Sequence, residues 1–244
     1  MGHLLHLFVV SLVLAPPVLA QDSLPPPPPL VAFTGDFGLV NTSGNTDVTT
    51  LNVGEEIKIN GGRLSLTQAF SVVYGRTDGE TTTSLWRSTL HGDLDLTEHV
   101  GVFVLIAWER NTFAGITRRL EETVGSTFQL IHLPRTTLVA QLGLSLIQQK
   151  TTAGLVDDNF AAGRSTLSFK QTFASKSFVQ QRVEFLPNLN DTNDYRINSE
   201  SSLVAPLSGS IALKASYVVR FDNQPEPTFE KTDRLLTTGL QITF

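Results

Sequence analysis

The chain has 244 residues and a formal net charge of −5, from 18 Lys and Arg against 23 Asp and Glu. This mild acidity argues against a nucleic-acid partner, because nucleic acids bind basic surfaces. The sequence contains no cysteine, which excludes a disulfide framework and thiol chemistry.

The first segment is an apolar run, LLHLFVVSLVLAPPVLA, over residues 4–20. An apolar run that ends in small or apolar residues is typical of an export signal, and it predicts a signal peptide over residues 1–20 with cleavage after Ala20. A membrane anchor helix is the alternative. Against it, Pro16 and Pro17 interrupt the run, and no basic residue flanks it.

A run of five prolines at 25–29 follows, and it predicts a stiff spacer over residues 21–30. The folded part is then residues 31–244, which is the size of one all-β domain. No later apolar run approaches the ~20 residues that a membrane-spanning helix needs. If this part of the chain crosses a membrane, strands must do it.

Turn-forming clusters rich in Gly, Asn, Asp and Pro divide residues 31–244 into twelve segments, most of them ten to sixteen residues long. Strands of soluble proteins average about five or six residues, whereas a tilted strand that spans a bilayer needs roughly nine to eleven. We therefore predict an all-β fold, a transmembrane antiparallel up-and-down β-barrel of twelve strands. The predicted strands cover residues 32–41, 47–60, 63–76, 81–96, 99–111, 117–131, 136–150, 159–174, 177–188, 194–206, 209–222 and 229–244.

The breaks between these strands alternate in length. The second, fourth, sixth, eighth and tenth breaks are tight (NGGR, LTEH, HLPR, ASKS and PLSG), while the odd-numbered breaks include the long TTAGLVDDN and DNQPEPT. Outer-membrane barrels have short periplasmic turns and longer outside loops. Twelve strands would put both termini on the short-turn side, so we expect periplasmic termini, a location in the bacterial outer membrane, and lipid around the barrel.

Apolar and polar residues alternate within the predicted strands. In the strand at 209–222, Ile211, Leu213 and Tyr217 share one face, while Lys214 and Arg220 lie on the other. A soluble antiparallel barrel would show the same alternation with its apolar face inward, so a soluble periplasmic β-protein is the alternative fold. Strand length and the recurrence of charged residues in mid-strand favour the membrane barrel.

The sequence ends in LLTTGLQITF, residues 235–244. Leu240, Ile242 and Phe244 occupy alternate positions, so they share the apolar face of the last predicted strand. An apolar terminal strand with a final Phe resembles the signal read by the barrel assembly machinery, and we predict that these three residues form it. The alternative is that apolar and polar residues alternate by chance in this last strand and carry no signal.

Four longer stretches carry a family resemblance: GDFGLVNTSGNTDVTTLNVGEEI (35–57) and the segments at 75–120, 190–203 and 216–244. They resemble the YdiY-like family of salt-induced outer-membrane proteins of Gram-negative bacteria, a domain of unknown function. The resemblance implies an outer-membrane barrel, with no known ligand and no catalytic residues. Leu105 and Ala107 depart from this family by placing apolar residues on the polar face, which argues against a uniformly wide aqueous channel.

The sequence offers few candidates for catalytic or metal-binding residues. His91 and Asp93 share a face, but a zinc site needs three or four converging ligands, and a hydrogen-bonded contact inside the barrel is the simpler interpretation. The Gly-x-Ser-x-Gly motif of serine hydrolases is absent. We therefore expect no enzyme activity, no cofactor and no metal.

The polar faces of the predicted strands place charges in the lumen. Ten are cationic: Lys58, Arg63, Arg87, Arg119, Arg164, Lys170, Arg182, Arg196, Lys214 and Arg220. Eight are anionic: Glu56, Asp93, Asp95, Glu109, Glu121, Glu184, Glu200 and Asp222. Confined charges must be paired or hydrated, and a twelve-stranded barrel is intermediate between filled and open ones.

Two functions follow from this lumen. The first is a narrow passive pore for small ions or solutes, in which the cationic excess gives a weak anion preference. The second is a plugged structural or surface-interaction barrel that acts through its extracellular loops. For the pore, the predicted lining cations are Arg87, Arg119, Arg164, Arg182 and Arg220, with Glu109 and Glu184 as the partners that fix their geometry.

Overall fold

The computed structural model describes residues 29–42, 48–77, 80–152 and 158–244. The predicted signal peptide, and all of the predicted spacer except its last two residues, lie outside this part of the chain. No helix among the described residues is long and apolar enough to cross a membrane. The elements are β1 (Val31–Thr42), β2 (Val48–Gly61), β3 (Leu64–Thr77), β4 (Glu80–Asp95), β5 (Val100–Asn111), η1 (Thr112–Ala114), β6 (Ile116–His132), β7 (Thr136–Thr151), β8 (Asp158–Thr172), β9 (Phe178–Pro187), β10 (Tyr195–Pro206), β11 (Ile211–Asp222) and β12 (Thr232–Thr243).

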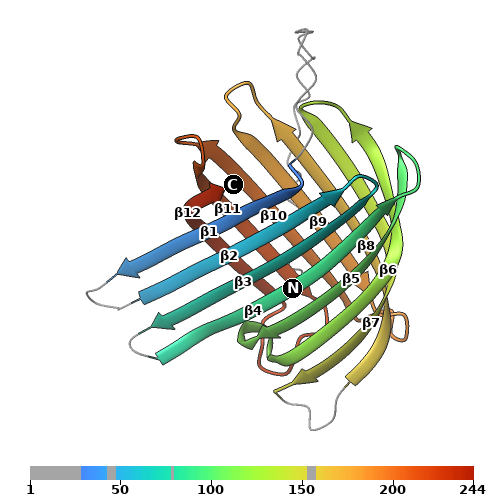
Figure 1. Ribbon diagram of the computed structural model, residues 1–244. Helices are drawn as coiled ribbons and strands as arrows, with labels where there is room; N and C mark the ends of the chain where they lie inside the picture. The colour runs from blue at the N-terminus through green and yellow to red at the C-terminus, as the bar shows by residue number, and fades with distance from the viewer. Residues whose placement is uncertain (1–28, 43–47, 78–79, 153–157) are drawn as a thin grey trace, which may run out of the picture.

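The strands form a closed barrel in which each strand pairs antiparallel with the next, and β12 returns to pair with β1. Figure 1 shows this order around the barrel wall. The predicted fold is confirmed, and every predicted strand end lies within three residues of the observed one. The largest difference is the start of β12. Residues 223–231 form a turn there, in which Phe229 N–H donates to Glu226 C=O and Thr228 adopts a φ of 77°.

The two ends of the barrel differ. One end, here called the turn end, carries the connections at 62–63, 96–99, 133–135, 173–177 and 207–210, together with the start of β1 and the finish of β12. The other, called the loop end, carries the connections that follow β1, β3, β5, β7, β9 and β11. Phe33 and Phe244 exchange two backbone hydrogen bonds of 3.0 Å at the turn end. Which end faces the periplasm stays a prediction.

The outer surface of the barrel is apolar. On β5, Val102, Val104, Ile106 and Trp108 are exposed, whereas the alternating inward residues from Phe103 to Asn111 are buried. Large apolar side chains are exposed on the other strands as well. A soluble protein rarely exposes so much contiguous apolar surface, and a barrel in a bilayer requires it. The soluble alternative with an inward apolar face is therefore wrong.

One side of the lumen is filled by apolar side chains. Ile147, Phe160 and Ala162 form a buried cluster on β7 and β8. Phe103 of β5 lies over a paired glycine position: a Cβ on Gly125 would come within 2.6 Å of the Phe103 ring, and one on Gly143 within 3.2 Å. The two glycines make room for the inward ring, so side chains fill the lumen along this wall.

Candidate functional site

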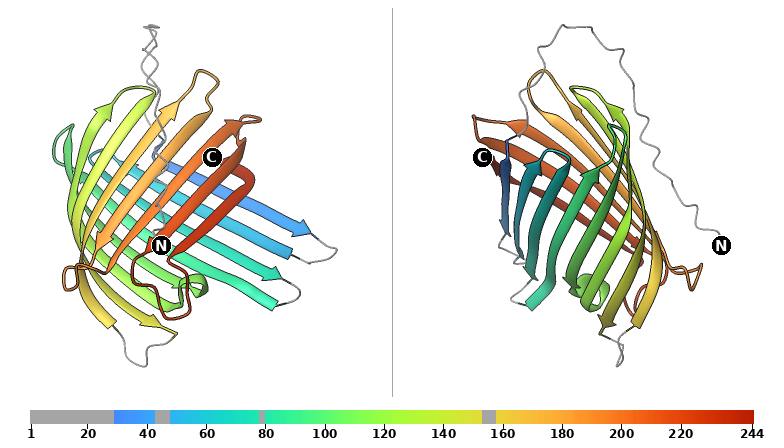
Figure 2. Two further views of the ribbon diagram at one scale, coloured as in Figure 1. Left: turned by 180° about the vertical axis from the view of Figure 1, so that it is seen from behind. Right: turned by 45° about the vertical axis from the view of Figure 1, so that its right-hand side comes forward.

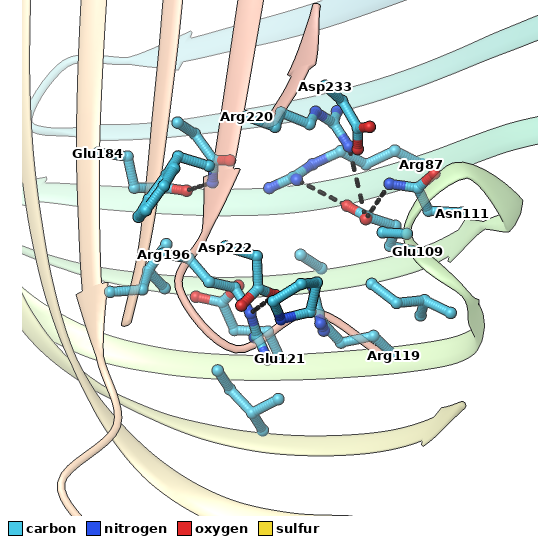
Figure 3. A pocket seen from close by; sticks show the side chains of 18 of the residues that line it. Arg87, Glu109, Asn111, Arg119, Glu121, Glu184, Arg196, Arg220, Asp222 and Asp233 are labelled. Carbon is cyan, nitrogen blue, oxygen red and sulfur yellow. Dashed lines mark hydrogen bonds and ion pairs between the residues drawn. The ribbon is translucent and has the colours of Figure 1, made fainter. Parts of the chain in front are cut away.

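Among the cavities of the described barrel, two lie in the lumen and share part of their lining. The larger, about 650 Å³, is lined toward the turn end by residues such as Phe178 and Thr243. The smaller, about 60 Å³, lies toward the loop end, where Pro225 and Lys231 contribute to its wall (Figure 3). Four residues line both cavities, and we call them the constriction: Arg87, Glu184, Asn198 and Arg220.

The first group at the constriction is centred on Glu109. Arg87 Nη1 donates to Glu109 Oε2 at 2.9 Å, and Arg220 Nη1 lies 3.5 Å from Oε1 of the same carboxylate. Asn111 Nδ2 also donates to Oε1, at 3.4 Å. Figure 3 shows the three side chains converging on Glu109 from β4, β5 and β11. Two guanidinium groups share one carboxylate, so this group has a net charge of +1.

The second group is centred on Arg164, whose side chain is 1% exposed. Its Nη1 donates to Glu121 and its Nη2 to Glu184. Thr123 and Ser145 hydroxyls donate to Glu121 Oε1 at 3.0 and 3.1 Å. These bonds connect β6, β7, β8 and β9 on the inner face of the barrel beside the apolar cluster. The group is the most buried set of charged side chains in the described chain.

The Glu184 carboxylate makes two further interactions besides the one with Arg164. Asn198 Nδ2 donates to Glu184 Oε1 at 2.9 Å, and Arg182 Nη2 lies 3.6 Å from Oε2. Arg182 is more exposed than Arg164, with 43% of its side chain accessible. The Arg164 and Arg182 cations balance the Glu121 and Glu184 anions, so this second group is neutral as a whole.

Arg119 lies at the loop end of the smaller cavity. Its Nε and Nη2 donate to Gln149 Oε1 at 3.1 and 2.8 Å. The neighbouring Arg196 donates through Nε to Asp222 Oδ2 at 3.0 Å, and its Nη2 reaches the same Gln149 oxygen at 3.4 Å. Gln149 thus holds two guanidinium groups side by side (Figure 3 shows Arg119, Arg196 and Asp222).

The structure brings all seven predicted pore-lining candidates to the two cavities. Arg87, Arg220 and Glu184 line both; Arg119 and Glu109 line the smaller; Arg164 and Arg182 line the larger. They form the groups described above rather than a continuous cationic ladder. Their role in conduction stays a prediction.

The sequence-based count of lumen charges needs correction. Arg63 lies exposed in the turn between β2 and β3, not on an inward face. The cavities are also lined by five charged residues that the sequence-based count did not include: Asp36, Glu55, Glu230, Lys231 and Asp233. Asp36 is bound by Lys214 Nζ at 2.5 Å and by Gln241 Nε2 at 3.0 Å. Counted this way, ten cations face twelve anions, and the overall cationic excess disappears.

Alternation could have found Asp36, because it lies between outward-facing Gly35 and Phe37 on β1. No signal in the sequence marks Gln149 or Asn198 as partners of charged groups. Gln149 is one of two adjacent glutamines near the loop end of β7, and its role depends on Arg119 of β6 and Arg196 of β10.

The predicted assembly-signal residues lie at the end of β12. Leu240 and Ile242 are exposed on the outer face, and Phe244 is 73% exposed, with its ring centroid 6.3 Å from that of Phe33. Their part in assembly stays a prediction.

Within the described residues, no group of three or more His, Asp or Glu side chains could hold a metal ion. His91 Nε2 lies 3.4 Å from Asp93 Oδ2, and both approach Gln141 Nε2 at 3.4 Å. His91 and Asp93 therefore make a contact inside the barrel.

An antiparallel barrel of twelve long strands, with an apolar outer band and a charged lumen, defines this chain as an outer-membrane β-barrel. The chain belongs to the family described as "Protein of unknown function, DUF481", whose model matches residues 35–244. The narrower YdiY-like resemblance stays a prediction. No curated protein matches the sequence.

Solved structures with a similar fold include three outer-membrane barrels. The NanC porin has a TM-score of 0.50 at 10% identity, covering 86% of this chain and 97% of the porin. The translocator domain of autotransporter NalP from Neisseria meningitidis has a TM-score of 0.47 at 14% identity, covering 88% and 87%. The anion-selective porin from Comamonas acidovorans has a TM-score of 0.45 at 9% identity, covering 88% and 98%. At these identities the likeness concerns the fold alone.

Proposed function

We propose that this protein is a narrow passive pore of the bacterial outer membrane for small ions or solutes, with a weak preference for anions. The observation that carries the proposal is that the two lumen cavities share the constriction as part of their lining, and its four members are all polar or charged. Water and small ions can exchange along such a surface, since its side chains replace part of an ion's hydration shell.

The anion preference rests on local charge. At the constriction itself the charges balance, because Arg87 and Arg220 face Glu184 and share the adjacent carboxylate of Glu109, so the preference depends on the larger cavity. The larger cavity is lined by six cations against five carboxylates. The cations are Arg87, Arg164, Lys170, Arg182, Lys214 and Arg220, and the carboxylates are Asp36, Glu55, Glu56, Glu184 and Glu200. A guanidinium keeps its charge at any accessible pH, so the preference persists across the pH range.

The orientation belongs to the same proposal. The connections are two to five residues long at the turn end and two to nine at the loop end, and both described chain ends lie at the turn end. Outer-membrane barrels keep short turns on the periplasmic side. We therefore place the turn end in the periplasm and the loop end outside, with outer-membrane lipid around the apolar band and the barrel assembly machinery as the partner during insertion.

Planar-bilayer recording of the purified barrel tests the pore. The expected result is discrete conductance with a reversal potential that indicates anion preference, and a shift toward cations for Arg87→Glu and for Arg220→Gln. Arg63→Glu is the matched control for Arg87→Glu, because it makes the same charge change on an exposed turn and should leave the reversal potential unchanged. Heat-modifiable migration of each variant verifies folding. No conductance from barrels with verified insertion would refute the pore.

A specific observation favours the second function, a plugged barrel that acts through its loops. The segment 223–231 lies over the loop end of the smaller cavity, to which Pro225, Glu230 and Lys231 contribute. Phe229 packs on the loop after η1 so closely that a Cβ on Gly115 would lie 2.8 Å from its ring. If this segment seals the lumen, the bilayer stays silent while the loops remain available to a partner.

A further inference from the structure

The seam between β1 and β12 is short. Its register runs from Thr34–Thr243 to Phe37–Leu240. Both strands extend well beyond it, β1 to Thr42 and β12 back to Thr232. In the described chain no register pair joins the two strands in these extensions, and the strands diverge toward the loop end (Figures 1 and 2). We call this gap the split; it lies between residues 38–42 of β1 and residues 232–238 of β12.

The strands that border the split are intact. β1 stays paired with β2 as far as Thr42–Val48, and β12 stays paired with β11 as far as Thr232–Phe221. The split is therefore not a frayed end of either strand. It is a separation of two well-formed sheet edges, each of which presents backbone N–H and C=O groups toward the other.

Two glycines mark the point where the seam ends. A Cβ on Gly239 would lie 2.1 Å from the carbonyl oxygen of Phe37, and one on Gly38 would lie 2.6 Å from that of Thr238. Only residues without a side chain allow the backbones to come this close. The edges thus meet tightly at Gly38 and Gly239 and separate from there.

The larger cavity reaches the split from inside. Leu235, Thr237 and Thr238 of β12 line it, as do Lys214 and Arg220 of β11, the strand next to β12. The outer rim of the split is apolar instead: Leu39 is 57% exposed and Leu236 68%. The lining of the larger cavity thus extends along the β12 edge of the split, whose outer rim is apolar.

The bilayer constrains what can occupy this gap. Unpaired backbone polar groups in hydrocarbon cost several kcal/mol each, so neither acyl chains alone nor an empty gap satisfies the two edges. A molecule with a polar head and an acyl tail satisfies both sides. Its head can bond to the edges and compete with Asp36 for Lys214 and with Glu109 for Arg220, while its tail lies against Leu39 and Leu236.

We propose that the split is a lateral opening through which an acyl-chain amphiphile with an anionic head enters the larger cavity from the surrounding leaflet. This proposal does not depend on ion conduction between the barrel ends. A silent bilayer would refute the pore and leave the lateral opening standing.

Tryptophan fluorescence with brominated lipids tests the proposal. Trp86 and Trp108, the two tryptophans of the chain, are first replaced by Phe. Thr237→Trp then reports from the edge of the split, and Thr89→Trp is the matched control, because it lines the same cavity from β4, within an intact wall. The barrels are reconstituted in vesicles of acyl-brominated phosphatidylglycerol or acyl-brominated phosphatidylcholine.

The expected result is several-fold stronger quenching of Thr237→Trp than of Thr89→Trp, and stronger quenching of Thr237→Trp by phosphatidylglycerol than by phosphatidylcholine. Equal, weak quenching of both positions would overturn the opening. Equal quenching of Thr237→Trp by the two lipids would overturn the anionic head.

A second measurement uses the absence of native cysteine. Continuing the seam register would set Asn41 opposite Leu236, so a pair of Asn41→Cys and Leu236→Cys can form a disulfide only if the seam extends. Phe37→Cys with Leu240→Cys, partners in the observed register, is the control. The split predicts much slower cross-linking in the first pair. Cross-linking at equal rates would show a fully paired seam and overturn the proposal, even if the Thr237→Trp variant failed to fold.

Discussion

Replacing Arg164 by Met tests the buried charge network. The Arg164 side chain is 1% exposed, and its two carboxylate partners, Glu121 and Glu184, are 8% and 6% exposed. The substitution keeps much of the side chain's bulk but leaves two buried carboxylates without their main cation. Removing one partner of a buried ion pair costs about 3–5 kcal/mol.

The remaining contacts of the two carboxylates determine how much stability the Arg164→Met barrel should lose. Glu184 retains Asn198 and the more distant Arg182, and Glu121 retains two hydroxyl donors. These contacts offset part of the loss but supply no close, buried cation. We therefore expect the free energy of unfolding to fall by about 3–5 kcal/mol rather than by twice that amount, although two ion pairs are lost.

Urea unfolding of the barrel reconstituted in lipid vesicles, followed by tryptophan fluorescence and heat-modifiable migration, measures this change. A triple variant, Arg164→Met with Glu121→Gln and Glu184→Gln, is the matched control. It removes the unpaired charges and should recover most of the stability. A loss below about 1 kcal/mol in Arg164→Met, or no recovery in the triple variant, would refute the reasoning that these charges are buried and mutually dependent.

Three further predictions concern the seam, the last strand and export. Gly239→Ala should lower the free energy of unfolding by about 1–3 kcal/mol, because its Cβ would lie 2.1 Å from the Phe37 carbonyl oxygen. Gly209→Ala is the control and should have no such effect, because no atom beyond its chain neighbours lies within 4 Å of a Cβ placed there. Equal urea unfolding midpoints for the two variants would contradict the prediction. Phe244→Asp should reduce the heat-modifiable fraction in outer-membrane preparations, and a normal fraction would count against the assembly signal. N-terminal sequencing of the exported chain should give a sequence that starts at the residue after Ala20. An intact N-terminus would exclude cleavage there.

Much of the fold could be predicted because it is written in local patterns. Strand length and the alternation of apolar with polar residues are properties of each strand alone, so twelve strands and their inward faces follow without knowledge of neighbours. β5 illustrates this: its outward Val104 and Ile106 and its inward Leu105 and Glu109 follow from a period of two. The same logic fails at Arg63, because a residue at a strand end can turn out of the strand.

Which charges pair could not be predicted, since pairing depends on the register between strands and on the shape of the lumen. Arg164 and Glu121 lie 43 residues apart and meet only because β6, β7 and β8 are aligned in one register. The position of the split depends in the same way on how β1 and β12 meet when the barrel closes. The alternating sequence of each strand therefore determined a barrel with a charged interior, whereas only the tertiary structure decided which charges meet at the constriction and where the pairing of β1 with β12 ends.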